Sequence, residues 1–532
     1  MKGASWLWTL LPIGLFFTAL AIRGYSLSTL IAYPDEMIYG IRALHILGSN
    51  WAWLPQDMWD QPPLLIYLIA GVLAVFGGGL EAARWVSVIS GALSVLIAYY
   101  LGKSMYGRVA GIVASVAIMV DGFDILYSRL IYIEALATML ILGATLLFWE
   151  GVVKKRDVKL AAAGGLVFGL AMDSKYISFV MAAALVLFLI IYRNKFQRGF
   201  PGKEALVFFL VSLAVLLPVF TDLAVNNVDP FYWDLATRFS VVKIHSLAGT
   251  EVIGQLLYAG FSQFTRVLFH VSSLNPFQVY PPLVISIPTW TAIVIVVCAV
   301  FGVSFLFRRN PADGLLVLLF LGFLAFQFTY PNKRIYFSLY PSVIFLVMLG
   351  GLFQRSIGRV RLRGKSKSLM PYLALGVIAL TVLAVSTNAF AVPVMYQNGF
   401  GDWDEIAPIV TYINNNHLPN AYVATSLPEF GYYIELDQVN VSVAFMIQPS
   451  TFYATPPINQ TLQTPYKGVY PLLWVISPDS IEKLHPQFIA MPAADYDDTT
   501  LAFQQWVTQR YYQPLSTQLF LLFEVRPNST AA

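Results

Sequence analysis

The feature that most constrains the fold of this 532-residue chain is a series of long apolar runs. A transmembrane helix needs about 20 apolar residues, because each residue adds about 1.5 Å to a path through about 30 Å of hydrocarbon. The plausible spans are 6–22, 84–101, 109–127, 131–149, 160–172, 177–192, 205–220, 285–307, 314–330, 336–353 and 370–390. The chain is 58% hydrophobic and 12% charged, which excludes an ordinary soluble protein. We therefore expect a polytopic α-helical membrane protein with about eleven transmembrane helices.

A further apolar run at 64–76 is too short to count as a span. It has 13 residues and follows Pro62 and Pro63, and runs of this length re-enter the membrane, lie at its surface or are buried by protein. If it does not cross, the connections on the N-terminal side carry 19 of the 33 basic residues and four of the 29 acidic ones. The positive-inside rule then predicts a cell-membrane protein with a cytoplasmic N-terminus.

The composition changes near position 392, after which no run is long enough to span a membrane. Four segments have strand patterns, namely 422–425, 439–445, 472–476 and 520–525, and two have helix patterns, 403–414 and 500–511. We predict a transmembrane domain over 1–392, with outer loops 23–83 and 221–284. An extracytoplasmic α/β domain follows over 393–532.

Charged residues gather at the outer ends of the predicted helices. They are Asp35, Glu36, Arg129, Lys175, Lys333 and Arg334. Carboxylates orient and deprotonate a hydroxyl, and fixed cations hold a phosphate whose charge grows as it leaves. The pattern favours transfer from a lipid-linked phosphate on the outer face of the membrane.

Structural explanations of the same residues remain open. Pro34 and the two acids suit the first turn of a surface helix, and Lys175 suits a short polar loop. Arg129 and Glu134 are five residues apart on one presumed helix, so Glu134 is expected about 7.5 Å deeper. Arg129 is then an interfacial arginine, and Glu134 is a buried acid bonded to a neighbouring helix.

The loop 221–284 holds the residues that come nearest to a metal site. His245, His270, Asp229 and Asp234 lie there, but they lack a recognisable ligand spacing. A single cysteine, Cys298, excludes a disulfide framework and a thiolate cluster. We predict no metal and no required cofactor.

Four motifs resemble those of membrane glycosyltransferases of the GT-C fold. They are Pro34-Asp35-Glu36 with Tyr39, Gln61-Pro62-Pro63-Leu64, Ser128-Arg129 with Glu134, and Asn332-Lys333-Arg334-Ile335-Tyr336 through Pro341. The resemblance covers roughly the first 350 residues. It is to the protein O-mannosyltransferases that use dolichyl-phosphate mannose and to the aminoarabinose transferases that act on lipid A.

The resemblance implies an inverting transfer of one mannose-like sugar from a polyprenyl or dolichyl phosphate. The acceptor is a hydroxyl of an extracytoplasmic protein, glycan or lipid, and no nucleotide or nucleic acid takes part. Asp35 is the implied base, with Glu36 beside it, and Arg129 the implied contact to the donor. The remaining predicted donor or phosphate contacts are Glu134, Lys175, Lys333, Arg334 and Gln61. Tyr39 and Tyr336 are predicted to contact the acceptor or the sugar.

The chain departs from this family at three places. Gln61 stands where relatives have His or Lys, Glu134 replaces an Asp, and loop 221–284 is too short for the β-trefoil domain of eukaryotic protein mannosyltransferases. An oligosaccharyltransferase is the alternative enzyme, and a lipid or sugar transporter is the alternative without covalent chemistry. Transporters show matched broken helices near the midplane, whereas the short run at 64–76 has no later counterpart.

Overall fold

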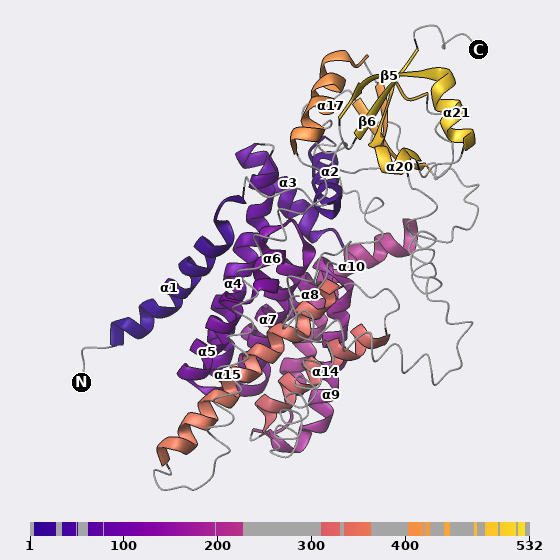
Figure 1. The fold of residues 1–532 in the computed structure, drawn as a ribbon. Helices are drawn as coiled ribbons and strands as arrows, with labels where there is room; N and C mark the ends of the chain where they lie inside the picture. Colours follow the sequence, from indigo (N-terminus) through magenta and orange to yellow (C-terminus); the bar gives the residue numbers. More distant parts are fainter. Residues whose placement is uncertain are drawn as a thin grey trace, which may run out of the picture. The chain divides into compact units, whose positions relative to one another are not determined.

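The computed structural model divides the chain into two compact units, which are described separately. The first unit is Met1–Leu27, Trp59–Leu65 and Arg84–Met395, and the second is Ser28–Met58, Ile66–Ala83 and Tyr396–Ala532. The described residues are 5–27, 34–48, 51, 62–77, 79–196, 198–226, 310–329, 335–362, 403–418, 421–425, 441–446, 473–475, 485–497, 501–517 and 520–526. Figure 1 labels their main elements.

The first unit is built from helices. Its α-helices are α1 (Ser5–Gly24), α4 (Leu80–Tyr106, whose first residues group with the second unit), α5 (Arg108–Met119), α6 (Gly122–Arg129), α7 (Ile133–Leu147), α8 (Val158–Ser174), α9 (Phe179–Ile191), α10 (Gly202–Asn226), α14 (Pro311–Thr329) and α15 (Leu339–Leu362). Its shorter helical segments are η3 (Phe148–Lys155), η4 (Tyr176–Ser178), η5 (Arg193–Lys195) and η8 (Ile335–Ser338). Helix α8 packs on α7 and α10, and α15 packs on α5 and α14.

Several of these helices have the length and composition of membrane spans. Four described stretches qualify, namely Leu80–Tyr106, Ile133–Lys155, Gly202–Thr221 and Leu339–Ile357. The pair α5 and α6 makes a fifth if the two count as one bent span. Shorter apolar helices include Leu64–Phe76 and Pro311–Phe326. The multi-pass character predicted from the apolar runs is confirmed, while the number eleven stays a prediction because the runs 285–307 and 370–390 lie outside the described residues.

Helices α8 and α10 approach closely because α8 carries glycines on the face between them. A Cβ at Gly165 would lie 2.2 Å from the carbonyl oxygen of Phe208, and one at Gly169 would lie 2.6 Å from Cβ of Val215. Small residues allow such backbone contact between membrane helices. Any larger side chain at Gly165 would force the two helices apart.

The predicted span 109–127 is not one continuous helix, although its two helices can still count together as one bent span. Helix α5 ends at Met119, α6 begins at Gly122, and their axes differ by 59°. Asp121 lies at the break in an extended conformation, and its carboxylate accepts a hydrogen bond from the backbone N–H of Phe123 at 3.1 Å. An aspartate at this position caps a new helix and so competes with continuation of the old one.

A second break separates Arg129 from Glu134, so the expectation that they share one helix is wrong. Leu130 and Tyr132 are extended, with ψ of 159° and 137°. The hydroxyl of Ser87 on α4 accepts a hydrogen bond from the backbone N–H of Tyr132 at 3.4 Å. The same hydroxyl donates to the carbonyl oxygen of Tyr132 at 3.5 Å. These contacts satisfy backbone groups that a continuous helix would have paired internally.

The second unit contains two N-terminal helices and a mixed sheet. The helices are α2 (Pro34–Gly48) and α3 (Leu64–Phe76, of which Leu64 and Leu65 group with the first unit). The strands are β1 (Ala421–Thr425), β2 (Val441–Met446), β3 (Leu473–Val475), β4 (Phe488–Pro492), β5 (Tyr511–Ser516) and β6 (Phe520–Val525). Their order is β3-β2-β1-β4-β6-β5, with parallel pairing from β3 to β4 and antiparallel pairing from β4 to β5.

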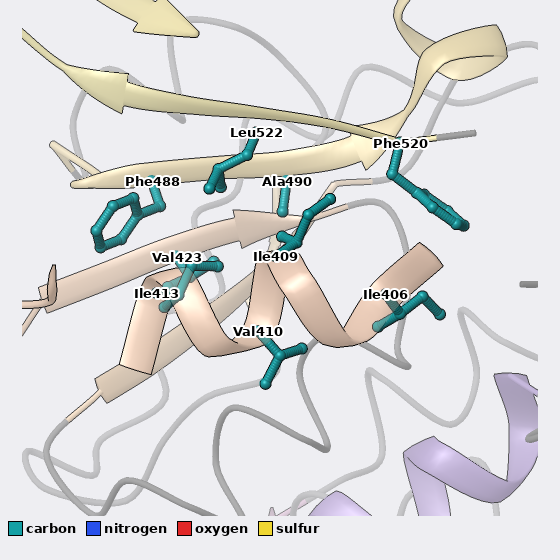
Figure 2. Packing of buried hydrophobic residues seen from close by; sticks show 9 residues of the cluster. All are labelled: Ile406, Ile409, Val410, Ile413, Val423, Phe488, Ala490, Phe520 and Leu522. Atoms are coloured by element: carbon teal, nitrogen blue, oxygen red, sulfur yellow. The ribbon is translucent and has the colours of Figure 1, made fainter. Parts of the chain in front are cut away.

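Helices cover both faces of this sheet, so its central strand β4 is buried on both sides. Phe488 and Ala490 pack with Ile409 of α17 (Trp403–Asn416), as Figure 2 shows. Ile489 and Met491 point to the opposite face and pack with Phe503 of α21 (Leu501–Arg510). The alternation follows from the two-residue repeat of a strand. A small C-terminal mixed sheet with helices is therefore confirmed.

The α17 side of the sheet also receives residues from the N-terminal part of the second unit. Leu44 of α2 and Leu80 pack against the cluster that contains Ile409 and Val410. Helix α2, which begins with the acidic pair, thus packs with the C-terminal segment.

Candidate active site

The acidic pair lies in the first turn of α2, which begins at Pro34. Proline suits the first helical position and carboxylates are stabilised near a helix N-terminus. The side chain of Glu36 is fully buried and Tyr39, three residues later, is 6% exposed, so the two share a face of the helix. The side chain of Asp35 lies outside the described residues, and its role as a base stays a prediction.

Arg129 occupies the last turn of α6, where a cation is favourable for the helix dipole. Its Nη2 donates a hydrogen bond to the carbonyl oxygen of Tyr25 at 2.6 Å. Tyr25 follows the end of α1. The Ser-Arg motif is thereby tied to the chain that leaves the first helix.

Glu134 and Lys175 form a buried ion pair, with Glu134 in the first turn of α7 and Lys175 directly after α8. Glu134 is fully buried and Lys175 is 7% exposed. This is the alternative that the sequence left open for Glu134, a buried acid bonded to a neighbouring helix. Lys175 Nζ also lies 4.5 Å from the ring centroid of Tyr336 and 5.3 Å from that of Phe337. The lysine therefore joins α7, α8 and the late segment η8.

Three tyrosine rings meet beside this ion pair. The rings of Tyr127 and Tyr132 have centroids 5.1 Å apart, and each lies 6.2 Å from the ring of Tyr336. Tyr127 is on α6, two residues before Arg129, and Tyr132 precedes α7. Aromatic pairs at these separations attract one another beyond simple burial. The cluster links the Ser-Arg motif to Glu134 and Lys175.

The structure thus brings together three residues predicted separately from the sequence, Glu134, Lys175 and Tyr336. Arg129 belongs to the same unit, whereas Glu36 and Tyr39 belong to the other. Gln61, Lys333 and Arg334 lie outside the described residues. The predicted grouping of all these residues around one donor site is therefore a proposal.

A second buried ion pair, which sequence analysis missed, lies at the start of α6. Arg23 of α1 and Asp124 of α6 form a salt bridge, with side chains 0% and 1% exposed. Arg23 Nη2 also donates to the carbonyl oxygen of Ile118 at 3.1 Å. In the sequence, an arginine at the end of an apolar run is equally typical of an interfacial anchor. Only the fold, which places Asp124 beside Arg23, shows that this arginine forms a buried ion pair instead.

In the described part of the chain, no group of three or more His, Cys, Asp or Glu side chains is arranged to hold a metal ion. The loop histidines His245 and His270 and the acids Asp229 and Asp234 lie outside that part. A metal-free mechanism stays a prediction.

Comparisons with known proteins find a family match over part of the chain. Residues 60–221 match the family model described as dolichyl-phosphate-mannose-protein mannosyltransferase. The undecaprenyl phosphate-alpha-4-amino-4-deoxy-L-arabinose arabinosyl transferase of Pseudomonas savastanoi pv. phaseolicola is 31% identical over 214 residues. That match spans 38% of this chain and 38% of the curated relative.

Solved structures show a similar fold along the whole chain. ArnT from Cupriavidus metallidurans bound to undecaprenyl phosphate superposes with a TM-score of 0.65, 13% identity and coverage of 100% of both chains. The archaeal oligosaccharyltransferase AglB from Archaeoglobus fulgidus gives a TM-score of 0.56 at 14% identity, covering 98% of this chain and 75% of that one. Together with the family match, these results confirm the resemblance predicted from the motifs.

Proposed function

We propose that this chain, which has an ArnT-like fold and a segment that matches the mannosyltransferase family, transfers one sugar from a polyprenyl-phosphate donor to an acceptor hydroxyl. The observation that carries the proposal is the position of the predicted donor residues. The matched segment 60–221 contains Arg129, Glu134 and Lys175, and the structure places Tyr336 beside the buried ion pair of the last two. A shared fold alone does not define a reaction, so the proposal rests on this cluster and the segment match together.

The proposed reaction is a single displacement at the anomeric carbon. Asp35 takes the proton of the acceptor hydroxyl, and the hydroxyl oxygen forms a bond to that carbon. The bond from the anomeric carbon to the phosphate oxygen breaks, and its electron pair leaves with the polyprenyl phosphate. The products are an inverted glycoside and a free polyprenyl phosphate. Because the sugar is already activated, positioning and charge stabilisation suffice and no cofactor is needed.

Arg129 is the proposed principal contact to the donor phosphate. A guanidinium presents several N–H donors in a fixed plane that suits phosphate oxygens, and Arg129 is held at the end of α6 by the Tyr25 carbonyl. Lys175 is proposed to act with it, and its ion pair with Glu134 fixes the ammonium group beside Tyr336. Gln61, Lys333 and Arg334 complete the proposed site, with Glu36 beside the base.

The donor we propose is an undecaprenyl-phosphate or dolichyl-phosphate sugar. The curated relative is named for undecaprenyl phosphate, and the ArnT structure contains that lipid. The predicted topology puts the reaction on the outer face of the cell membrane. The acceptor is then an extracytoplasmic protein, glycan or lipid.

The experiment that tests this proposal follows a labelled sugar. Purified full-length protein is incubated with radiolabelled polyprenyl-phosphate sugars and host membranes, and the product is located by mass spectrometry. Asp35→Asn should leave a folded protein that binds undecaprenyl phosphate but transfers little sugar. Asp497→Asn is a matched control, because Asp497 is exposed on α20 (Ala493–Asp497) and has no role in the proposed reaction.

Two outcomes would overturn the proposal. Full turnover by Asp35→Asn would remove this residue from the role of base. Absence of covalent product from every donor, together with transport of the lipid across reconstituted vesicles, would replace the enzyme with a transporter.

An oligosaccharyltransferase is the second candidate, favoured by the similarity to AglB over 98% of this chain. It predicts transfer of a whole glycan to asparagine of a peptide instead of one sugar to a hydroxyl. The same mass analysis distinguishes them, because the mass added and the modified atom differ.

A further inference from the structure

Helix α6, which carries the Ser-Arg motif, is too short to fix its own orientation. It has eight residues, Gly122–Arg129, which is about two turns. Isolated helices of this length are unstable, so their position depends on tertiary contacts. The direction of the Arg129 guanidinium therefore depends on what holds α6.

The C-terminal end of α1 and the residue that follows it contact both the start and the end of α6. Arg23 pairs with Asp124 in the first turn of α6. Two residues after Arg23, the carbonyl oxygen of Tyr25 accepts the hydrogen bond of Arg129 at 2.6 Å. The two contact points on α6 are five residues apart, about 7.5 Å along the helix axis. A clamp at two points fixes both the place and the rotation of a helix, whereas one contact does not.

Arg23 also holds the bend that precedes α6. Its Nη2 donates to the carbonyl oxygen of Ile118 at 3.1 Å, and Nη1 lies 3.5 Å from that of Met119. Carbonyls in the last turn of a helix have no partner within that helix, and these two belong to the end of α5. One guanidinium therefore contacts the end of α5 and the start of α6, on both sides of the bend at Asp121.

The neighbouring helix α4 leaves room for this arrangement. A Cβ added at Gly91 would lie 2.4 Å from Cβ of Ser128 and 2.8 Å from Nε of Arg23. The absence of a side chain at this position lets the Ser-Arg motif and the Arg23 guanidinium pack against the α4 backbone. Gly91 therefore helps to fix the position of α6, as the ion pair of Arg23 and Asp124 does.

A buried arginine and aspartate are not the most stable way to join helices. Desolvation of two charges offsets much of their attraction, and apolar replacements are often equally stable. Charged groups inside membrane proteins are costly and mark functional positions. The pair is better explained by the geometry that it imposes on α6 than by its contribution to stability.

We propose that Arg23 is a positioning residue for the donor phosphate, which acts by holding Arg129 through the clamp of α1 on α6. The proposal rests on the proposed function of Arg129 as the phosphate contact. Arg23 itself touches no donor in this scheme. Its effect on donor binding passes entirely through Arg129.

The test is a double-mutant cycle on binding of undecaprenyl phosphate to the purified full-length protein. The variants are Arg23→Gln, Arg129→Gln and the double variant, with binding measured as thermal stabilisation over a titration of the lipid. We expect each single change to weaken binding about tenfold, the scale of one charge-assisted hydrogen bond. The double variant should bind no more weakly than Arg129→Gln, because residues that act through one another are not additive.

A third ion pair, in which Asp313 is buried and the Arg355 side chain is 22% exposed, supplies the control. Arg355 on α15 binds Asp313 on α14 through two hydrogen bonds of 2.6 and 3.1 Å, and neither residue is placed in the site. Asp313→Asn should lower the thermal midpoint and leave lipid affinity unchanged. Arg23→Lys should bind the lipid more tightly than Arg23→Gln, because a lysine keeps the ion pair with Asp124. Its affinity should stay below that of the unmodified protein, because the hydrogen bonds to the α5 carbonyls are weakened.

The outcomes separate the two proposals. If Arg129→Gln binds the lipid normally, the assigned role of Arg129 fails and the positioning role fails with it. If Arg129→Gln weakens binding but Arg23→Gln does not, or if the two losses add, only the positioning role is overturned. Should Arg23→Gln fail to fold, Arg23→Lys and Asp124→Asn carry the same cycle with Arg129→Gln.

Discussion

The ion pair of Glu134 and Lys175 allows a sharp test of what each residue does. Both side chains are buried, at 0% and 7% exposure. Replacement of Glu134 with Leu leaves the Lys175 ammonium enclosed without its carboxylate. Loss of one partner of a buried pair costs about 3–5 kcal/mol, because the remaining charge is uncompensated. The cation–π contact of Lys175 with Tyr336, at 4.5 Å, is present before and after the change and so does not reduce this cost. We therefore expect Glu134→Leu to destabilise the protein by about 3–5 kcal/mol.

The double variant Glu134→Leu/Lys175→Met should be much more stable than Glu134→Leu alone. Both charges are gone, and Met keeps the length of the lysine stem, so the remaining cost is about 1–2 kcal/mol from lost packing and cation–π contact. The assay compares thermal midpoints in one detergent with undecaprenyl-phosphate affinity for the same samples. A double variant as unstable as Glu134→Leu, or less stable, would refute the reasoning about an uncompensated charge.

The same double variant separates a structural from a functional lysine. If Lys175 contacts the donor phosphate as proposed, the recovered fold should still bind the lipid about tenfold more weakly. If affinity recovers together with stability, Lys175 and Glu134 serve only to hold α7, α8 and Tyr336 together.

Two other predictions concern different parts of the chain. Gly91→Ala should cost about 1–3 kcal/mol of stability and weaken donor binding, because its Cβ would lie 2.4 Å from Cβ of the neighbouring serine on α6; a normal thermal midpoint and affinity would contradict the close packing. In the C-terminal segment, the carboxylate of Glu524 accepts hydrogen bonds from Tyr412 and Tyr512. The hydrogen bond to Glu524 raises the pKa of Tyr512, and burial raises the pKa of Tyr412. As the pH rises, the two tyrosines lose their protons in the unfolded state first, so their contribution to stability is complete below pH about 10 and falls above it. Tyr512→Phe should therefore flatten the fall in thermal midpoint between pH about 9 and 11. An unchanged slope in this variant would contradict the role of the Tyr512 hydrogen bond.

Apolar run length predicted the helices of this protein because burial of backbone polar groups leaves few alternatives in a membrane. Several predicted runs coincide with observed helices, such as α8 (Val158–Ser174) and α10 (Gly202–Asn226). The breaks were harder to predict. The one after Met119 depends on an aspartate cap, and the one at 130–132 depends on Ser87 from another helix.

In the sheet, the predicted strands were those with clear alternation or β-branched residues. Strands β4 and β5 were missed for physical reasons. β4 is buried on both faces, which removes the polar positions that mark a half-buried strand. β5 contains Pro514, which argues against a strand from sequence but is tolerated here because β5 is at the edge of the sheet.

At the candidate site, the sequence indicated which residues are important, but only the packing of the helices shows which of them contact one another. Glu134 and Lys175 were each predicted as donor contacts, but a sequence separation of 41 residues carries no information about their pairing. The structure shows a buried ion pair on each of the two helices that the link joins, α6 and α7. Arg23 and Asp124 hold the start of α6, Glu134 and Lys175 hold the start of α7, and Ser87 holds the link itself. A phosphate contact must be placed within a fraction of an ångström to stabilise a leaving group. The ion pair on the short helix α6 meets this demand for the proposed role of Arg129, because it holds the helix that carries the Ser-Arg motif.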